Sequence, residues 1–233
     1  MKRLAELEAA LERHGVDPGV AAVLDRILGA LEREPDPHTA VDPLDAVDVH
    51  VADSLAGLAV EPLREAGSIA DVGAGAGFPG LVLAAALAHA RVDLIEAARR
   101  KAAVIERLIA AGGLANARPV AERAEDWAAS EGRESYAAVT ARAVASLAVL
   151  VEYAAPLLAP GGALVAWKGV RDPDEERRAA VAGEQLGLAL DATIPVTPYA
   201  GSRNRHLHVF RKVAPTPDGF PRRAGMALKR PLG

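Results

Sequence analysis

The stretch Asp71-Val72-Gly73-Ala74-Gly75-Ala76-Gly77-Phe78-Pro79-Gly80 decides the fold of this chain. It overlaps the short, partly β-branched run 68–72, which is typical of a buried parallel strand. The three alternating glycines permit a sharp turn, and because they carry no Cβ they let the backbone lie directly against a ligand. Pro79 sets φ for a first helical turn, and an apolar helix is predicted over 80–87. A strand, loop and helix of this kind is typical of nucleotide-binding proteins.

The glycine spacing alone leaves two cofactor classes open. The Gly-x-Gly-x-x-Gly pattern over 75–80 also satisfies the dinucleotide fingerprint, which is weak by itself. A second predicted strand ends on Glu96, about 20 residues further on, where a carboxylate can bind ribose hydroxyls in a dinucleotide fold or in a methyltransferase. A dinucleotide also needs a pyrophosphate site and a proton-handling group, and the candidates, His50 and Lys168, have no recognisable dehydrogenase setting. S-adenosylmethionine carries no phosphate and does not need a pyrophosphate site. We therefore rank a dehydrogenase below a methyltransferase as the function of this chain.

Composition limits the protein class. With 233 residues, of which 51% are hydrophobic, the chain can bury a full α/β core. It has no cysteine, which excludes disulfides and thiolate zinc sites, and we predict no metal site. No apolar stretch is long enough to span a bilayer, and charges alternate along the N-terminus. We therefore expect a cytoplasmic protein with no membrane contact, and nothing in the sequence demands more than a monomer.

Charge is distributed unevenly along the chain. From residue 201 to 233 there are eight Lys or Arg residues against Asp218 alone, a net charge of +7. Since the whole chain carries −4, the remainder carries −11. An acidic body with a basic end indicates an anionic macromolecular partner, because Lys and Arg neutralise phosphates and release counterions. A solvated basic tail is the alternative interpretation.

The first third of the chain is predicted to be helical. Helical spacing of leucines indicates two antiparallel helices before residue 32, and the proline-rich segment 34–43 is a loop. A third helix is predicted from Asp45 to about Leu58. On it His50, Asp53 and Ser54 stand at i, i+3 and i+4, on one face. That face either overlooks a substrate or holds a histidine satisfied by a neighbouring aspartate.

From Ser68 to about Gly187, strand and helix patterns alternate, which favours a parallel sheet covered on both faces. Two further strands are predicted at 192–196 and 206–211, as a closing pair. In open α/β sheets ligands bind beyond the carboxyl ends of the strands. The residues predicted to fall there are Gly73, Glu96, Ala124, Glu125, Arg142 and Lys168.

Several motifs together point to one family. They are His50-Val51-Ala52-Asp53-Ser54-Leu55, the loop 71–80, Arg142-Ala143-Val144-Ala145-Ser146-Leu147 and Trp167-Lys168-Gly169. Arg205-His206-Leu207 and the basic end 220–232 extend the set. From about His38 onward the chain resembles the bacterial ribosomal RNA small-subunit methyltransferase G family, also called glucose-inhibited division protein B. Each motif alone is unspecific, whereas the combination is specific.

The resemblance implies transfer of a methyl group from S-adenosyl-L-methionine to N7 of one guanine in 16S ribosomal RNA, free or within the small ribosomal subunit. It implies an α/β, Rossmann-like class I methyltransferase with a mostly parallel seven-stranded sheet and helices on both faces. We expect an N-terminal helical appendage over 1–60, the methyltransferase domain over 61–213 and a basic tail over 214–233. The cofactor contacts expected from the resemblance and from the strand ends are Gly73, Gly75, Gly77, Phe78, Ile95, Glu96, Ala97, Ala124, Glu125 and Arg142. The residues expected to contact RNA are His50, Lys168, Arg203, Arg205, Arg222, Arg223, Lys229 and Arg230.

Guanine N7 is an unprotonated lone pair, so this reaction has no proton to remove and we predict no essential general base. Catalysis would then come mostly from alignment and desolvation. Because side chains cannot reach N7 in an A-form duplex, the target base must be unstacked or displayed in an irregular junction. Two alternatives stay open: a methyltransferase acting on another RNA or a small molecule, and a nucleotide-binding regulatory protein linked to cell division.

Overall fold

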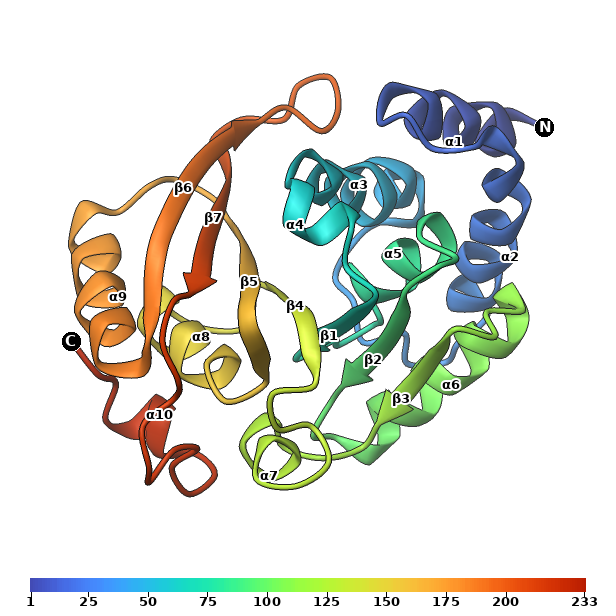
Figure 1. The fold of residues 1–233 in the computed structure, drawn as a ribbon. Coiled ribbons are helices and arrows are strands. Elements are labelled where there is room, and N and C mark those ends of the chain that lie inside the picture. Colours follow the sequence, from blue (N-terminus) through green and yellow to red (C-terminus); the bar gives the residue numbers. More distant parts are fainter.

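A twisted seven-stranded sheet runs through the centre of the computed structural model, which describes residues 1–233 (Figure 1). The strands are β1 (Ser68–Val72), β2 (Arg91–Ile95), β3 (Ala117–Val120), β4 (Tyr136–Arg142), β5 (Leu158–Lys168), β6 (Leu188–Val196) and β7 (Arg205–Lys212). Their order is β3-β2-β1-β4-β5-β7-β6; the first five are parallel, and β7 lies antiparallel between β5 and β6. The predicted mostly parallel sheet and its closing strand pair are confirmed.

Helices cover both faces of the sheet (Figure 1). One layer contains α2 (Ala21–Glu32), α5 (Gly80–Ala86) and α6 (Arg99–Gly112); the other contains α7 (Ala124–Ala128), α8 (Leu147–Ala154) and α9 (Pro173–Leu186). Successive residues of β1 enter different cores, because side chains alternate along a strand: Ile69 packs into the first core, and Ala70 and Val72 into the second. Burial on both faces explains why β1 reads as a continuous apolar run.

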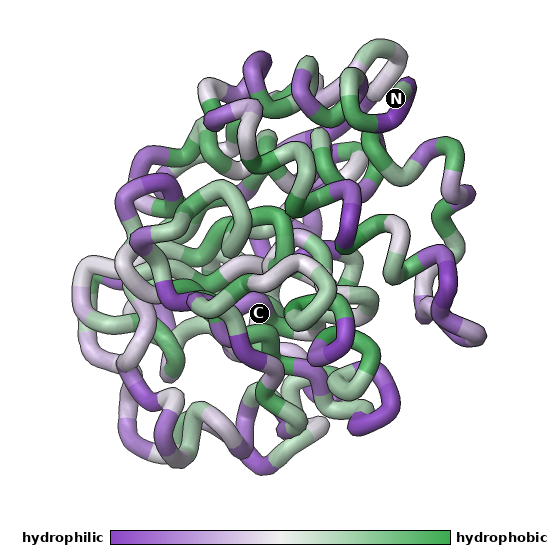
Figure 2. Tube along the Cα trace, turned by 90° about the vertical axis from the view of Figure 1, so that its right-hand side faces the viewer, coloured by the Kyte–Doolittle hydropathy of each residue, from purple (hydrophilic) through white to green (hydrophobic).

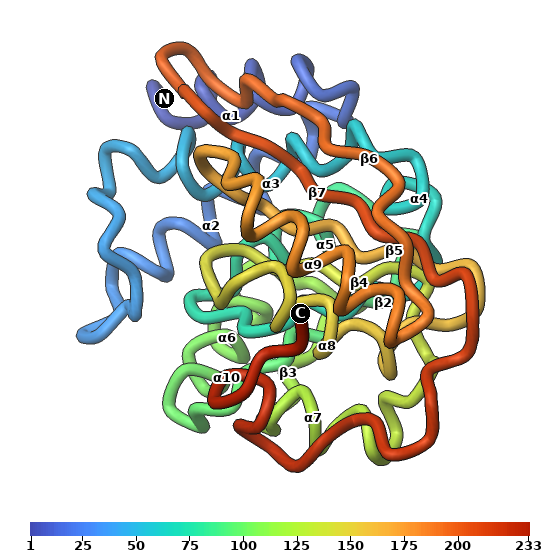
Figure 3. The backbone as a smooth tube through the Cα atoms, turned by 90° about the vertical axis from the view of Figure 1, so that its left-hand side faces the viewer, coloured from blue at the N-terminus to red at the C-terminus, as the bar shows by residue number.

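The N-terminal helices pack onto the body of the protein. α1 (Lys2–Arg13) buries Leu7 and Leu11, and hydrophilic and hydrophobic residues alternate along it in Figure 2. A short 3-10 turn, η1 (Pro18–Val20), capped by Asp17, leads into α2. Figures 1 and 3 both show the β6–β7 loop beside α1, where Arg13 Nη1 donates a hydrogen bond to the Pro198 carbonyl at 2.9 Å. The two predicted helices are confirmed, but Figure 1 shows α2 running across the direction of α1 and not antiparallel to it.

The third predicted helix is not regular, so the prediction of one helix over 45–58 is wrong. The chain instead forms η2 (Pro43–Asp45), the π-helical turn η3 (Val47–Ala52), α3 (Asp53–Leu55), η4 (Ala56–Ala59) and α4 (Glu61–Arg64). The physical reason is an inserted side chain: Arg142 Nη1 donates to the carbonyl of Val49 at 2.9 Å and widens the turn. The irregular turn carries His50 and leads directly into Asp53.

The basic C-terminal segment is folded onto the second helical layer. It contains the short helix α10 (Met226–Lys229), which contacts α8 and buries Ala227. The interpretation of a solvated tail is therefore wrong for its backbone. No helix of the protein is long and apolar enough to cross a membrane.

Candidate cofactor and substrate site

A cavity of about 580 Å³ opens where the parallel strands end. This volume is in the range of small-molecule and cofactor sites. Its lining includes all but one of the predicted cofactor residues, namely Gly73, Gly75, Phe78, Ile95, Glu96, Ala97, Ala124, Glu125 and Arg142. The exception is Gly77, which is buried behind the loop. A Cβ at Gly77 would lie 2.4 Å from Leu81 Cδ1, so this glycine is needed for packing, which corrects its prediction as a contact.

The glycine loop is tied to the end of β2. The amide of Gly73 donates to the Ile95 carbonyl at 2.9 Å, and the amide of Ala74 donates to the same oxygen at 3.1 Å. Gly73 has φ +68°, Gly75 +59° and Gly77 +98°, all in the left-handed region that favours glycine. Gly73 and Gly75 line the cavity, so the loop backbone borders the space where a cofactor is expected.

Glu96 is held in one orientation by backbone amides. Its Oε2 accepts from the Gly75 amide at 3.1 Å and its Oε1 from the Ala98 amide at 2.9 Å. Only 8% of the residue is exposed. A carboxylate oxygen accepts more than one hydrogen bond, so both oxygens can still receive hydroxyl donors from the cavity. This geometry suits the vicinal hydroxyls of a ribose.

A buried carboxylate occupies the start of α5. Asp71 Oδ2 accepts from the Gly80 amide at 2.9 Å, and Oδ1 accepts from the Thr140 hydroxyl at 2.9 Å. Burial raises the pKa of Asp71 to about 6. Dinucleotide-binding folds place their pyrophosphate at this helix end. Here the Gly80 amide at the start of α5 is already bonded to Asp71 and is not free for a phosphate, which favours a cofactor without phosphate.

His50 forms part of the cavity wall by stacking on Phe78, with ring centroids 4.2 Å apart and planes 13° from parallel. Its Nε2 lies 3.2 Å from the Thr39 hydroxyl, so the alternative of a histidine satisfied by the neighbouring aspartate is wrong. Burial, together with the charge of Arg142, lowers the pKa of His50 to about 4. The imidazole is therefore neutral at physiological pH.

The stability of the protein should depend on pH through His50. The pKa of this side chain is about 4 in the folded state against an ordinary value of 6.5, so between these values only the unfolded chain takes up the proton. Stability from this residue is present above pH 6.5 and is lost as pH falls toward 4. We expect the difference in unfolding free energy between wild type and His50→Phe, which keeps a stacked ring, to change by about 3 kcal/mol over that window. Urea titrations of both proteins at pH 4.5 to 7 test this, and a pH-independent difference would contradict it.

Arg142 joins the irregular helix to the cavity. Its Nη1 donates to Asp53 Oδ2 at 2.9 Å, while Nη2 has no hydrogen-bond partner in the protein and can meet an anionic ligand group. Arg205, from the start of β7, lies on the other side of the same carboxylate, with Nε 3.8 Å from Oδ1. The structure thus brings Arg142 and Arg205, from two of the family motifs, together at Asp53 of a third.

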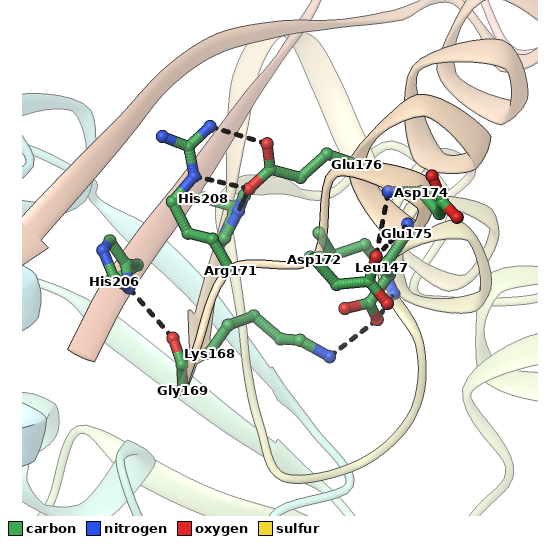
Figure 4. Close-up of polar contacts among 10 residues, drawn as sticks. All are labelled: Leu147, Lys168, Gly169, Arg171, Asp172, Asp174, Glu175, Glu176, His206 and His208. Carbon is green, nitrogen blue, oxygen red and sulfur yellow. Dashed lines mark hydrogen bonds and ion pairs between the residues drawn. The ribbon is translucent and has the colours of Figure 1, made fainter. Parts of the chain in front are cut away.

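Lys168 is the last residue of β5, and Figure 4 shows its ammonium group paired with Glu175 of α9. Its Nζ donates to Glu175 Oε1 at 2.7 Å, and the same oxygen accepts the Leu147 amide at 2.9 Å. His206 Nδ1 lies 2.9 Å from the Gly169 carbonyl, which fixes the segment after Lys168. An RNA contact by Lys168 stays a prediction, and it would have to compete with this ion pair.

The predicted RNA-binding cations fall into two groups. Apart from Lys168, Arg203 lies in the β6–β7 loop and Arg205 begins β7, while Arg222, Arg223, Lys229 and Arg230 lie on the C-terminal segment. Arg203, Arg223, Lys229 and Arg230 are exposed and form no ion pair. Arg222 differs, because it makes a bidentate ion pair with the buried carboxylate of Glu152. Its guanidinium stabilises the fold and is not free to contact RNA phosphates.

The C-terminal segment also closes one side of the large cavity, which the sequence did not indicate. The Gly225 amide donates to Glu125 Oε1 at 2.7 Å, and Leu228 lines the cavity. Further lining residues that were not predicted include Lys101, Glu122, Val144 and Tyr153. Val144 packs over Gly73, where a Cβ would come within 2.7 Å of its Cγ2. Only Val144 lies in a recognisable motif; the others carry no pattern of their own.

The topology separates the two cofactor classes that the sequence left open. A dinucleotide fold of this order has a sixth parallel strand beyond β5. Here an antiparallel strand, β7, occupies that place. Together with Asp71 at the helix start and Glu96 at the end of β2, this arrangement defines a class I methyltransferase that uses S-adenosyl-L-methionine.

Comparison with known proteins assigns the family. A sequence model described as GidB, rRNA small subunit methyltransferase G, matches residues 39–194. The chain is 43% identical over 185 residues to the Ribosomal RNA small subunit methyltransferase G of Pelotomaculum thermopropionicum, covering 78% of this chain and 77% of that protein. It is 39% identical over 208 residues to the protein of the same name from Thermotoga neapolitana, covering 89% of each. The chain belongs to this family.

Solved structures share the fold. Aeropyrum pernix fibrillarin, described with natively bound S-adenosyl-L-methionine, superposes with a TM-score of 0.53 at 17% identity, covering 68% of this chain and 72% of that one. Mitomycin 7-O-methyltransferase superposes with a TM-score of 0.58 at 16% identity, covering 90% of this chain and 67% of that one. The predicted class I methyltransferase fold is confirmed.

Proposed function

We propose that this protein transfers a methyl group from S-adenosyl-L-methionine to N7 of a guanine in 16S ribosomal RNA. The observation that carries the proposal is the cavity at the strand ends, where backbone amides hold Glu96 in place to accept ribose hydroxyls. Membership of the small-subunit methyltransferase G family supports ribosomal RNA as the substrate class.

Different cavity residues would contact different parts of the cofactor. Glu96 takes the ribose hydroxyls, Ala124 and Glu125 border the adenine, and Arg142 offers Nη2 to the carboxylate of the methionine portion. When bound, the cofactor supplies an electrophilic methyl on a sulfonium. The N7 lone pair forms the new N–C bond while the C–S pair returns to sulfur, so the positive charge passes to the base and no proton leaves.

Because no proton leaves, the protein needs to align the guanine and exclude water, and it needs no general base. The state of His50 supports this, since a neutral imidazole with its ring stacked on Phe78 serves as a wall. The exposed cations of the β6–β7 loop and the C-terminal segment can contact the RNA backbone around the cavity.

We therefore expect His50→Phe and Lys168→Gln each to retain methyl transfer within about 10-fold of wild type at pH 7, since general-base catalysis contributes about 100-fold or more where it operates. The rate of a saturated single turnover, measured with tritiated cofactor and unmodified small subunits, checks this. Loss of activity with cofactor and RNA affinity intact would show that one of these side chains handles a proton.

The same assay tests the function itself. Label should enter 16S RNA, and chemical cleavage specific for N7-methylguanine should release it at one position. Label in another base, or in a small-molecule fraction instead of RNA, would support a methyltransferase of different substrate. If no label is transferred to any acceptor, the remaining interpretation is a nucleotide-binding regulatory protein.

A further inference from the structure

A second cavity adjoins the cofactor cavity. It has a volume of about 180 Å³ and shares Asp53, Arg142, Ala143 and Arg205 with the larger one. Its other walls include Lys168, Gly169 and His206, which Figure 4 shows fixed by their contacts with α9 and β7. A cavity of about 150 Å³ is enough to hold benzene, so this one is on the scale of a single nucleobase.

Asp53 lines both cavities, and one of its buried carboxylate oxygens has no hydrogen-bond partner. The residue is only 3% exposed, and Oδ1 has no hydrogen-bond partner, with Arg205 Nε no nearer than 3.8 Å. Oδ2 is already bonded to Arg142. The backbone is fixed as well, because Trp167 Nε1 donates to the Asp53 carbonyl at 2.8 Å. A buried acceptor held rigidly without a donor indicates that a ligand supplies the donor.

We propose that the smaller cavity receives the guanine to be methylated and that Asp53 recognises its Watson–Crick edge; this inference rests on the proposed function. Guanine is the only RNA base with two adjacent donors, N1–H and N2–H, on that edge. Adenine presents an acceptor at N1, which a carboxylate repels. A planar base in the smaller cavity can turn N7 toward the larger cavity across the wall that the two cavities share.

The same contact would assist the chemistry. Methylation places positive charge on the base, which makes N1–H and N2–H stronger donors. Their hydrogen bonds to Asp53 therefore strengthen from the ground state to the transition state, and only such interactions raise kcat. Asp53 becomes a catalytic residue that moves no proton, while Arg142 positions its carboxylate.

The first experiment removes the N2 amine from the target guanine and the carboxylate from Asp53. Small subunits are reconstituted with 16S RNA that carries guanine or inosine at the methylated position; inosine lacks only the N2 amine. Wild type should prefer guanine by about 10- to 100-fold in kcat/KM, the effect of one hydrogen bond to a charged acceptor. Asp53→Asn should be slower on guanine and should show a guanine-to-inosine ratio near one. An unchanged ratio in the variant, or no preference in wild type, would overturn the proposal.

A second pair of variants addresses the cavity without touching Asp53. Val196 lines only the smaller cavity, whereas its neighbour Thr197 is exposed and lines neither. Val196→Phe should reduce methyl transfer more than about 100-fold with unchanged affinity for S-adenosylhomocysteine, and Thr197→Phe should behave as wild type. Equal activity of the two variants would show that the base does not enter this cavity.

The outcomes separate this inference from the proposed function. In one outcome wild type methylates N7 of guanine, while the guanine-to-inosine ratio is unchanged in Asp53→Asn and Val196→Phe keeps full activity. In that case the base is recognised elsewhere and the proposed function stands. If wild type labels no guanine in either reconstituted particle, the proposed function itself fails. Calorimetry with S-adenosylhomocysteine and a thermal melt on Asp53→Asn confirm that the variant is folded and binds cofactor.

Discussion

Replacing Gly75 with alanine should weaken binding of S-adenosylhomocysteine more than about 10-fold and leave the protein folded. Gly75 lines the cofactor cavity, and a Cβ there would meet only the Gly73 carbonyl oxygen at 3.8 Å, so the methyl would enter space kept for the ligand. Its φ of +59° lies in the small left-handed region, where alanine costs about 1 to 2 kcal/mol. Overpacking costs about 1 to 3 kcal/mol, and each 1.4 kcal/mol is tenfold in affinity.

The matched change, Gly77→Ala, should act on stability instead. Gly77 has φ +98°, beyond the range of about +50 to +70° that residues other than glycine can adopt, and its Cβ would clash with Leu81. We expect a loss of about 3 kcal/mol or more of unfolding free energy. Urea unfolding and calorimetry on both variants decide the matter. If Gly77→Ala were as stable as Gly75→Ala, the division of the loop into a packing glycine and a ligand-facing glycine would be wrong.

The sequence predicted those parts of the fold that depend on local pattern. β1 is recognisable because both of its faces are buried, and the glycine loop because its backbone conformations are costly for other residues. Glu96 was predictable as a site residue from its place at a strand end. Its two bonds to loop amides then fix the orientation that the pattern could not specify.

Features that depend on distant residues could not be predicted. The helix around His50 is irregular because Arg142, far along the chain, donates to its backbone. The Gly225 amide reaches Glu125 across 100 residues of sequence, and no period or motif connects the two. Charge counting also failed to separate cations that stabilise the fold from cations left free for RNA. The clearest case is a pair of adjacent arginines.

Arg222→Ala should destabilise the protein by about 3 to 5 kcal/mol, whereas Arg223→Ala should change its stability by less than about 0.5 kcal/mol. Arg222 makes a bidentate ion pair with Glu152, whose side chain is 3% exposed, so removing the guanidinium strands a buried carboxylate. Arg223 is exposed and forms no ion pair. Its loss should instead weaken RNA binding and lower the slope of log K against log salt by about one. Denaturant unfolding and RNA titrations at several salt concentrations measure both effects.

A double substitution tests the cause of the destabilisation. If Arg222→Ala is harmful because Glu152 is left charged and unpaired, replacing both residues with leucine should recover most of the loss, since exchanging a buried ion pair for apolar residues is often neutral. The RNA affinity of that double variant should stay close to wild type, because Arg222 is committed to Glu152 and is not free for phosphate. A double variant as stable as wild type but weak in RNA binding would return Arg222 to the RNA-contacting set. Persistent instability would mean that the C-terminal segment needs this arginine for more than its charge, as its bond to the Arg230 carbonyl at 2.9 Å allows.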